Sequence, residues 1–586
     1  SNIDLGSTGR IEVLRGPLAQ LYGNAAGGVV QVFSADPAPR PSATLSAAGA
    51  PDGLFKVGTR FSTATPGYGL LVDASHFQTD GWREHSAARR GQLNARWQTD
   101  YARGSNLSVI ANALEQPLAQ DPIGLMRVQW QTDPHQTAPQ AIAQDARKSV
   151  RQQQLGSVLE HSFSDATVFT GRVYAGMRDL DNALSTPLVP QQSVTSSGGI
   201  VRFTRSYAGA AAQLAHTLRL GEGRALRLTG GIELDRMSED RQGYINDAGV
   251  QGALKRDEHN RVDNRDAYAQ AGLDVSAQWS VTAGLRTSRV RFRTEDRFIV
   301  PGNPGNPGNP GNPDDSGGVD YSATNPVLGV AWRAAETLNV YANVGRGFET
   351  PTFTELAYRA AGTGLNTDLR ASRSRHAELG AKWKPAQDQR LDVALFDIAT
   401  RDEIVVDTNN GGRSTFKNAG RTSRRGIEFS YSGRLAESLR GTLSLTELRA
   451  RFVDSFISGS GAAAVNVPAG NRLPGTPQRN AFAELVWTPT QVWPGFNAAL
   501  ELVHTGALFV DDANSDAAPA STVLNLRTGL AQNLGGWRFS ELLRIDNATD
   551  RRYIGSVIVN EANKRFFEPA LPRRWLLAMT ASYEFR

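Results

Sequence analysis

The residues of this 586-residue chain that could do chemistry are arginines, carboxylates and aromatic rings. There is no cysteine, which excludes thiolate nucleophiles, disulfides, thiolate-bound iron–sulfur clusters and zinc ribbons. The sequence also contains no phosphate-binding P-loop, no His-Glu-x-x-His pair and no complete dinucleotide fingerprint. The motifs therefore give no indication of covalent catalysis.

Arginine and aromatic residues at strand ends and in long polar segments are the candidates for binding. A guanidinium group holds an anion by charge-assisted hydrogen bonds, and an aromatic ring adds stacking. The alternative for each is an ordinary solvated charge, a satisfied histidine or part of an aromatic girdle at a membrane interface. The residues in question are Trp82, Arg83, His85, Arg346 and Tyr358.

The elements that would position these side chains are β-strands. From Ala267 to Gln278 apolar and polar residues alternate with period two, and the same alternation closes the chain from Trp575 to Phe585. No apolar run approaches the roughly 18 residues that a transmembrane helix needs. A membrane protein with this pattern must be a closed barrel, because only helices and barrels satisfy their backbone hydrogen bonds in lipid.

The connections between strand-like segments alternate in length. Turns such as Thr65-Pro66-Gly67 are short, whereas long polar connections are expected at about 115–147, 239–261, 296–318, 350–370 and 453–470. Short turns at one end and long loops at the other are typical of an outer-membrane barrel. We count 22 strands in 586 − 42 + 1 = 545 residues. A barrel of this size has a plugged lumen. We thus predict an all-β, 22-stranded antiparallel transmembrane barrel over residues 41–586.

The first forty residues have a different pattern. Arg10-Ile-Glu-Val-Leu-Arg-Gly-Pro17 is followed by Leu21-Tyr-Gly23 and a strand ending at Phe33. This order of motifs resembles the last part of the plug domain in TonB-dependent outer-membrane transporters. Further likenesses follow in the barrel, at Tyr341–Phe348 and Asn547–Tyr553. Residues 1–40 are thus identified as the C-terminal part of a plug inside the lumen. Family members begin with a signal peptide, a TonB box and a longer plug, so we expect the sequence to be N-terminally incomplete.

The resemblance implies the function. It implies TonB-dependent uptake of a ferric siderophore across the bacterial outer membrane, with the ligand bound by extracellular loops and lumen. The chain would be no enzyme and would hold no cofactor or metal of its own, since the iron travels within the chelate. Expected partners are TonB with its inner-membrane complex, the siderophore, and outer-membrane lipid and lipopolysaccharide around a monomer.

Three alternatives remain open. The same mechanism would serve haem or cobalamin, and His76 and His85 across one loop are the only suggestion of a haem-binding pair. A passive porin-like barrel is disfavoured by the plug-like segment. A nucleic-acid binder is suggested by the net charge of +5, but charges of both signs are interspersed along the chain.

The resemblance also implies a contact between plug and barrel. In the family the arginine matching Arg15 meets barrel-wall glutamates in motifs that correspond to Glu378 and Glu428. Alternation supports the match, because Glu378 shares a strand face with His376 and Gly380 that lies opposite the apolar face. Both carboxylates should face the lumen, since a charge on the lipid face costs up to a few kcal/mol. The alternative is that they are unconnected lumen charges beside water.

Overall fold

The computed structural model describes residues 3–24, 27–193, 196–221, 223–302, 311–359, 364–410, 413–459 and 464–585. Its main feature is a closed antiparallel barrel of 22 strands, which confirms the predicted fold class. The helices within the described residues are too short or too polar to cross a membrane.

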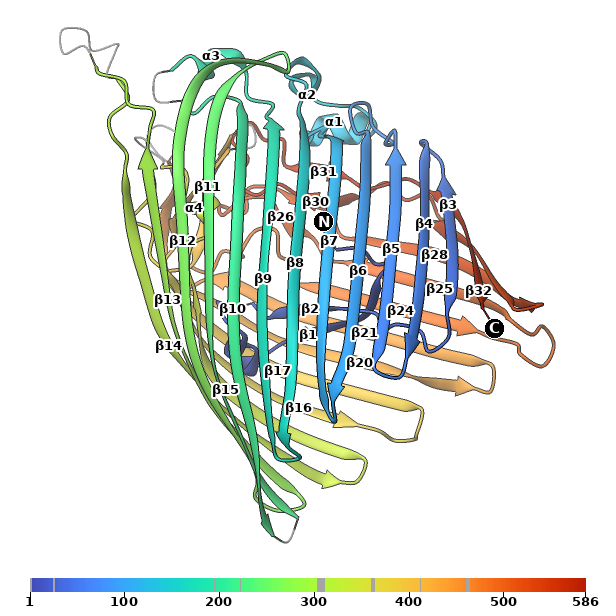
Figure 1. Ribbon diagram of the computed structural model, residues 1–586. Helices are drawn as coiled ribbons and strands as arrows, with labels where there is room; N and C mark the ends of the chain where they lie inside the picture. Colours follow the sequence, from blue (N-terminus) through green and yellow to red (C-terminus); the bar gives the residue numbers. More distant parts are fainter. Residues whose placement is uncertain are drawn as a thin grey trace.

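Every barrel strand pairs with its neighbours in the chain order of the barrel, and the last strand closes on the first. The barrel strands are β3 (Ser42–Ala50), β4 (Leu54–Thr65), β5 (Tyr68–Thr79), β6 (Ala88–Ala102), β7 (Ser105–Gln120), β8 (Arg147–Ser164), β9 (Thr167–Ala183), β10 (Ile200–Gly221), β11 (Arg224–Asp247), β12 (Val250–Asp274), β13 (Trp279–Asp296), β14 (Gly317–Ala335), β15 (Leu338–Glu349), β16 (Ser372–Trp383), β17 (Gln389–Arg401), β20 (Thr422–Ala436), β21 (Leu439–Phe452), β24 (Arg479–Trp487), β25 (Phe496–Thr505), β28 (Ser521–Leu534), β29 (Trp537–Asp546) and β32 (Arg574–Glu584). In the closure, Ser42 of β3 pairs with Glu584 of β32, so the two ends of the barrel sequence lie side by side (Figure 1).

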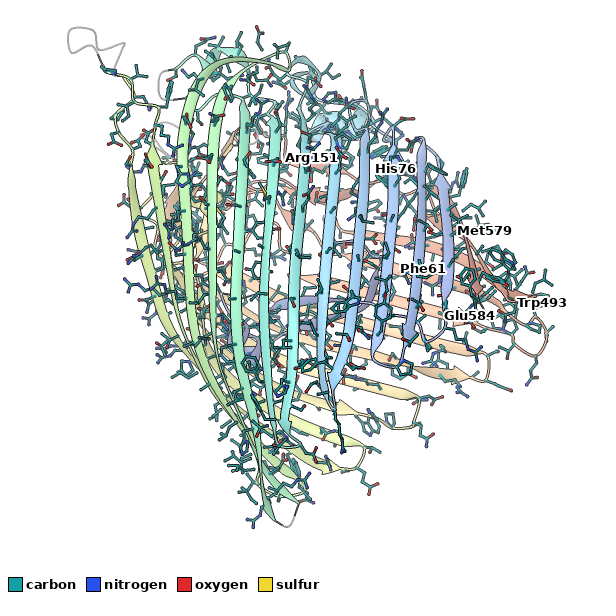
Figure 2. The ribbon with its side chains drawn as sticks, in the orientation of Figure 1. Phe61, His76, Arg151, Trp493, Met579 and Glu584 are labelled. Carbon is teal, nitrogen blue, oxygen red and sulfur yellow. The ribbon has the colours of Figure 1, made fainter. Side chains whose placement is uncertain are left out.

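Alternate residues of each strand face out and in, as the period-two pattern predicted. Met579 and Phe61 are exposed on the outer surface of the wall (Figure 2). At the end with short turns, Trp279 and Trp332 stack on neighbouring strands with ring centroids 5.6 Å apart. Such rings form the aromatic girdle at a membrane interface, so this end of the apolar band is marked by its side chains.

The opposite end carries the long connections, which contain short elements of their own. These are α1 (Arg127–Thr132), α2 (Pro139–Ala143), α3 (Leu188–Gln191), α4 (Phe353–Leu356), β18 (Ile404–Asn410), β19 (Arg413–Asn418), β22 (Phe456–Ser458), β23 (Val465–Val467), β26 (Leu508–Phe509), β27 (Ala517–Ala518), β30 (Ile554–Val557) and β31 (Phe567–Pro569). The loops pack on one another: Leu125, Val510 and Phe567 belong to one buried cluster that joins three connections.

The expected long loop at 239–261 is wrong. β11 and β12 continue through most of it, and their pairing runs on to Asp247 and Val250. Beyond the apolar band, water solvates both faces, so polar residues are tolerated on both sides of a strand. Ion pairs such as Arg236 with Asp263, 2.8 Å apart, also stabilise this hairpin. Polarity alone therefore does not indicate a loop at this end of a barrel.

The first part of the chain lies inside the barrel. β1 (Thr8–Leu14) pairs antiparallel with β2 (Val29–Ser34), and the 3-10 helix η1 (Pro17–Tyr22) lies between them. We call residues 8–34 the N-terminal hairpin. Figure 1 shows it, in dark blue, crossing the interior of the barrel. The first barrel strand starts at Ser42, a few residues after the hairpin ends.

Candidate functional site

The N-terminal hairpin is seated against the barrel by η1. The helix packs on the inner face of β13, β14, β15 and β16. Glycines in the wall give it room: a Cβ at Gly345 would lie 3.0 Å from Cβ of Pro17, and one at Gly284 would lie 2.8 Å from Leu21. Both Pro17 and Leu21 are buried. A larger residue at either glycine would therefore push the helix off the wall.

Arg286 on β13 bonds both the hairpin and the neighbouring strands of the wall. Its side chain is 2% exposed, and Nη1 donates to the carbonyl oxygen of Leu21 over 2.9 Å. Nη2 donates to Asp266 Oδ2 over 2.7 Å and also bonds the Glu233 carboxylate. The guanidinium therefore joins three barrel strands to the helix. A buried charge of this kind is stable only while its partners are present.

Sequence reasoning missed Arg286. Its inward direction follows from alternation, because the next residue back, Leu285, is exposed on the outer face. However, Arg289, Arg291 and Arg293 follow on the same strand and face outward. Alternation separates the inward Arg286 from these three outward neighbours, but without the position of the hairpin it does not show that Arg286 contacts the hairpin.

The structure brings the predicted trio together, with one direct ion pair. Arg15 Nη1 bonds Oε2 of Glu428 on β20. Glu378 on β16 contacts the backbone at Gly16, whose φ of +77° and close approach leave no room for a Cβ. The Arg15 side chain is 64% exposed, so its bond to Glu428 lies in the open lumen. The role of these residues in coupling hairpin to barrel remains a prediction.

Two further contacts fix the ends of the hairpin segment. Asn24, after η1, donates to the Thr350 hydroxyl over 2.7 Å and accepts from its amide over 2.9 Å. At the end of β2, the carbonyl oxygens of Ser34 and Ala35 accept hydrogen bonds from Arg96 of β6 over 3.1 and 3.2 Å. The hairpin is thus bound to the wall on opposite sides of the lumen.

A polar cavity of about 1110 Å³ lies between the hairpin and the wall of β6 to β13. Its barrel side presents amides and charges, among them Asn94, Gln152, Gln154 and Arg172. Its hairpin side includes Phe33. This lining suits a hydrated polar solute better than an apolar one.

Arg83 and His85 hold a loop in place. Arg83 is buried and donates four hydrogen bonds to the carbonyl oxygens of Pro122, Ile123 and Gln136. Burial lowers the pKa of Arg83. His85 Nε2 lies 2.9 Å from the carbonyl oxygen of Ala146. Both side chains therefore position the 121–146 loop, and the structure shows neither reaching into a ligand cavity.

Trp82 and Tyr358 lie in other surroundings. Trp82 is half-buried, with His135 edge-on at 4.8 Å between ring centroids. Tyr358 lies among basic groups at the loop end of the lumen: Arg241 donates to its hydroxyl over 3.1 Å, and the Arg256 guanidinium lies 5.1 Å from its ring centroid. Of the five binding candidates, Tyr358 is the one that the structure places in a lumen-facing cluster, in which Arg241 and Arg256 are themselves paired with Glu239 and Glu258.

Arg346 faces away from the lumen. On β15 it follows Ala342 and Val344 at period two, and Val344 is 51% exposed on the outer surface. Its direct neighbour across the sheet is Arg375 of β16. The structure therefore places Arg346 on the lipid-side face of the wall, where a ligand inside the barrel cannot reach it.

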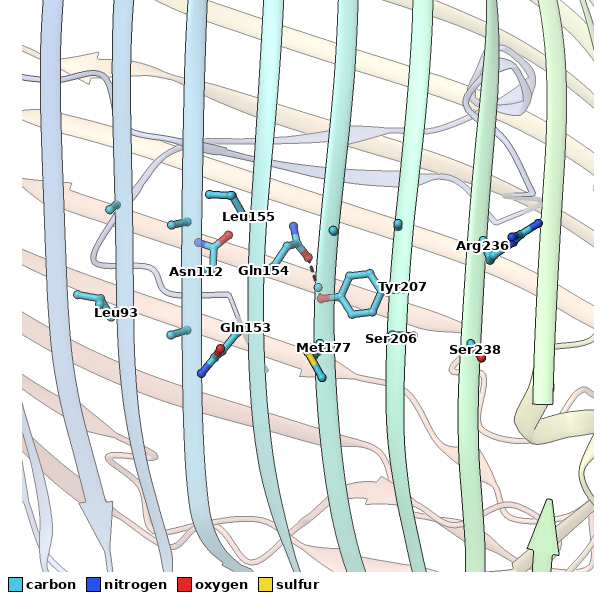
Figure 3. Close-up of a pocket in the computed structure, with 16 residues that line it drawn as sticks. Leu93, Asn112, Gln153, Gln154, Leu155, Met177, Ser206, Tyr207, Arg236 and Ser238 are labelled. Atoms are coloured by element: carbon cyan, nitrogen blue, oxygen red, sulfur yellow. Dashed lines mark hydrogen bonds between the residues drawn. The ribbon is translucent and has the colours of Figure 1, made fainter. Parts of the chain in front are cut away.

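A second concavity also opens outward. Its volume is about 680 Å³, and Figure 3 shows Leu93, Leu155 and Met177 from three strands among its lining residues. These residues lie on the exposed outer face. In the same view Tyr207 and Gln154, which share a hydrogen bond of 3.0 Å, lie on the lumen side of the wall. The outer concavity therefore faces lipid.

The loops are fastened to one another by an ion pair. Arg127 of α1 bonds the carboxylate of Asp516, with Nε to Oδ2 at 2.9 Å, and also the carbonyl oxygen of Ala517. The hydrogen bond from Arg127 holds the pKa of Asp516 below its usual range. This pair joins the connection after β7 to the connection after β25. No group of three or more acidic or histidine side chains suited to a metal ion occurs within the described ranges.

Comparison with known proteins agrees with this geometry. A family model described as "TonB dependent receptor-like, beta-barrel" matches residues 81–549. The ferric citrate transporter FecA in its unliganded form superposes with a TM-score of 0.80 at 18% identity, covering 100% of this chain and 85% of that one. The siderophore receptor PiuA from Acinetobacter baumannii gives 0.79 at 14% identity, with 98% and 86% covered.

A curated relative is similar over part of its length. The metal-pseudopaline receptor CntO from Pseudomonas aeruginosa is 24% identical over 333 residues, which is 56% of this chain and 42% of the relative. The match thus spans about two fifths of the relative's length. The family and these neighbours are transport receptors, not enzymes, as the sequence resemblance implied.

Proposed function

The chain belongs to the family of TonB-dependent receptors, which are outer-membrane proteins, and from that premise we propose that it takes up a metal chelate, in the first place a ferric siderophore. The chelate would bind to the loops and lumen, and TonB would displace the N-terminal hairpin to open a path. The iron would travel as part of the chelate, so the chain needs no cofactor.

One observation supports the proposal most strongly: a hairpin held inside a closed barrel by Arg286 and Arg15. A hairpin bonded across the lumen would obstruct passive diffusion, so this arrangement disfavours the porin alternative. Besides the packing of Pro17 and Leu21, the contacts are hydrogen bonds and an ion pair, which can break without unfolding the wall. Displacement of the hairpin would then require an energised partner that pulls on it.

A second candidate cargo is a chelate of another metal. It rests on the similarity to a receptor whose name specifies metal-pseudopaline. The polar cavity beside the hairpin favours neither kind of complex over the other, since its amides and charges would suit both. Haem and cobalamin remain weaker alternatives, because neither the lining nor the similar proteins indicate them.

Growth rescue tests the proposal. A strain lacking its own receptors would carry the full-length protein and receive ferric hydroxamate, catecholate or carboxylate chelates, or nickel and zinc aminocarboxylate chelates, as sole metal source. We expect rescue by a ferric chelate, abolished when TonB is deleted. Rescue only by the nickel or zinc chelates would favour the second candidate. Uptake that persists without TonB would overturn the proposed mechanism.

A further inference from the structure

Arginines gather on the outer surface of β15, β16, β17 and β20, near the loop end of the barrel. They surround a shallow cavity of about 600 Å³ whose lining includes a single carboxylate, Asp397. We call them the arginine belt: Arg346, Arg373, Arg375, Arg401, Arg421 and Arg425. The count of charged lining groups gives 6 − 1 = +5. This cavity is outside the barrel, so it is separate from the ligand path.

The strand register places like charges directly opposite each other. Arg346 pairs with Arg375, and Arg373 pairs with Arg401. Arg425 is opposite Arg449, a further exposed arginine on β21. Directly opposed like charges destabilise a sheet. Three such pairs on neighbouring strands therefore favour the binding of an anion from outside the protein, which would reduce the repulsion.

The protein supplies few anions of its own here. Arg425 pairs with Asp397 at 2.6 Å, and Arg421 pairs with Asp454 at 2.6 Å. In the part of the chain that the structure describes, Arg346, Arg375 and Arg401 have no ion-pair partner. By contrast, several outward arginines on other strands do have carboxylate partners: Arg151 pairs with Glu115 at 3.2 Å, and Arg236 pairs with Asp263 at 2.8 Å.

The belt lies at the height of lipid headgroups. On the outer face of β16, Arg375 is 383 − 375 = 8 residues from Trp383, which is exposed at the turn end. Eight residues span about 27 Å at roughly 3.4 Å per residue. Strand tilt reduces this to about 20 Å, close to the roughly 25 Å apolar band of such barrels. Leu379, 52% exposed, lies between the two. The arginines therefore stand where the apolar band ends on the loop side.

We propose that the arginine belt binds the phosphorylated sugar headgroup of an outer-leaflet glycolipid. Guanidinium groups form paired hydrogen bonds with phosphate oxygens, and several together hold a headgroup with two phosphates. The apolar surface next to the belt, at Val344 and Leu379, faces the acyl chains. An anionic chelate in the lumen is no competing occupant, because these side chains face outward. This proposal depends on outer-membrane location and not on the transported cargo.

Native mass spectrometry of the full chain in detergent tests the proposal with diphosphoryl lipid A as probe. We expect lipid bound to the wild type, and affinity reduced about ten-fold or more in the triple variant R346Q/R373Q/R375Q. Dephosphorylated lipid A should bind the wild type as weakly as the probe binds the triple variant. Excess inorganic phosphate should displace little lipid, because the acyl chains contribute to binding.

The matched control is R202Q/R236Q, which removes two outward arginines that are paired with carboxylates, outside the belt. It should keep wild-type affinity for the probe. Retention of the heat-sensitive folded band on gels confirms that each variant is folded. Equal binding of the two lipid forms, or equal losses in the triple variant and the control, would overturn the proposal. So would free phosphate that competes fully with the lipid.

Discussion

The inner and outer faces of β13 to β20 carry the same residue type in opposite circumstances. Inside, Arg286 is buried and bonded to two carboxylates and a carbonyl oxygen of the hairpin. Outside, three residues further along β13, Arg289 is exposed and shares Asp320 with two other arginines. Further around the wall, on the outer face of β15 to β20, the arginines of the arginine belt have fewer ion-pair partners within the protein.

The two faces show that the direction of a charged side chain, not its residue type, determines its partners in a barrel wall. An inward arginine meets protein groups and determines where the hairpin rests. An outward arginine meets lipid or water, and its surplus charge points to a ligand from outside the protein. The first two variants change the inner face, and their controls change the outer face or a neutral position.

The largest effect is expected from Arg286→Met. The change leaves Asp266 and Glu233 without their cation, and breaking a buried pair in this way costs about 3–5 kcal/mol. Urea unfolding in lipid vesicles would measure the free energy, and hydrogen exchange of residues 8–34 would report release of the hairpin. The control is Arg289→Met, on the outer face of the same strand, which should cost less than about 1 kcal/mol. Equal costs would remove the contrast between the faces.

The next effect concerns the space for η1. Gly345→Leu fills the position that Pro17 occupies, and overpacking of this kind costs about 1–3 kcal/mol. We expect faster exchange of the hairpin amides with an intact barrel. Gly272→Leu is the control, since a Cβ at Gly272 has no neighbour within 4 Å. A hairpin that exchanges at the wild-type rate in Gly345→Leu would show that η1 does not need this seat.

A smaller effect is expected at the lumen pair. Arg15→Ala should lower stability by about 1 kcal/mol or less, because the Arg15 side chain is mostly exposed. Combining it with Glu428→Gln in a double-mutant cycle isolates the pair. The coupling free energy should be positive but smaller than the cost of Arg286→Met. A larger coupling free energy would show that Glu428 on β20, and not Arg286 on β13, contributes most to holding the hairpin.

The smallest effect belongs to the loops. Arg127 lowers the pKa of Asp516, so the pair contributes stability above the unfolded pKa of about 3.9 and loses it as the pH falls through the lower folded value. Fluorescent labels on V128C and S515C would report separation of the two loops only in strong acid. In D516N the same labels should show no such transition. Separation near pH 6 would refute the assignment.

Much of the fold could be predicted because lipid imposes period two on a wall. Alternating segments such as Ala267–Gln278 and Trp575–Phe585 indicated strands, and the count of 22 such segments indicated the size of the barrel. The extension of β11 and β12 through 239–261 was not predicted, because outside the apolar band polar residues on both faces of a strand carry no energetic cost. There, cross-strand ion pairs replace alternation as the organising pattern.

The site was predicted only in part. Alternation indicated that Glu378 and Glu428 face the lumen, since inward direction is a local property of each strand, whereas their contact with Arg15 was implied by the family resemblance. The partners of Arg83 are backbone carbonyls of a loop 40 residues away, which depend on loop conformation and leave no pattern in the sequence. Arg346 is different: its parity with Val344 already indicated an outward direction.

In the proposed mechanism, the N-terminal hairpin must leave the wall for transport to occur. The chain has no cysteine, so Pro17→Cys/Gly345→Cys creates one defined disulfide, with Cβ positions 3.0 Å apart that need to open by about 1 Å. A control disulfide on the outer face joins T287C and T324C, which are cross-strand neighbours. Uptake of the metal chelate would be measured oxidised and reduced. We expect the oxidised Pro17–Gly345 pair to bind chelate but to transport none until it is reduced, whereas the control should transport in both states. Equal transport by the oxidised and reduced forms of the Pro17–Gly345 pair would contradict it.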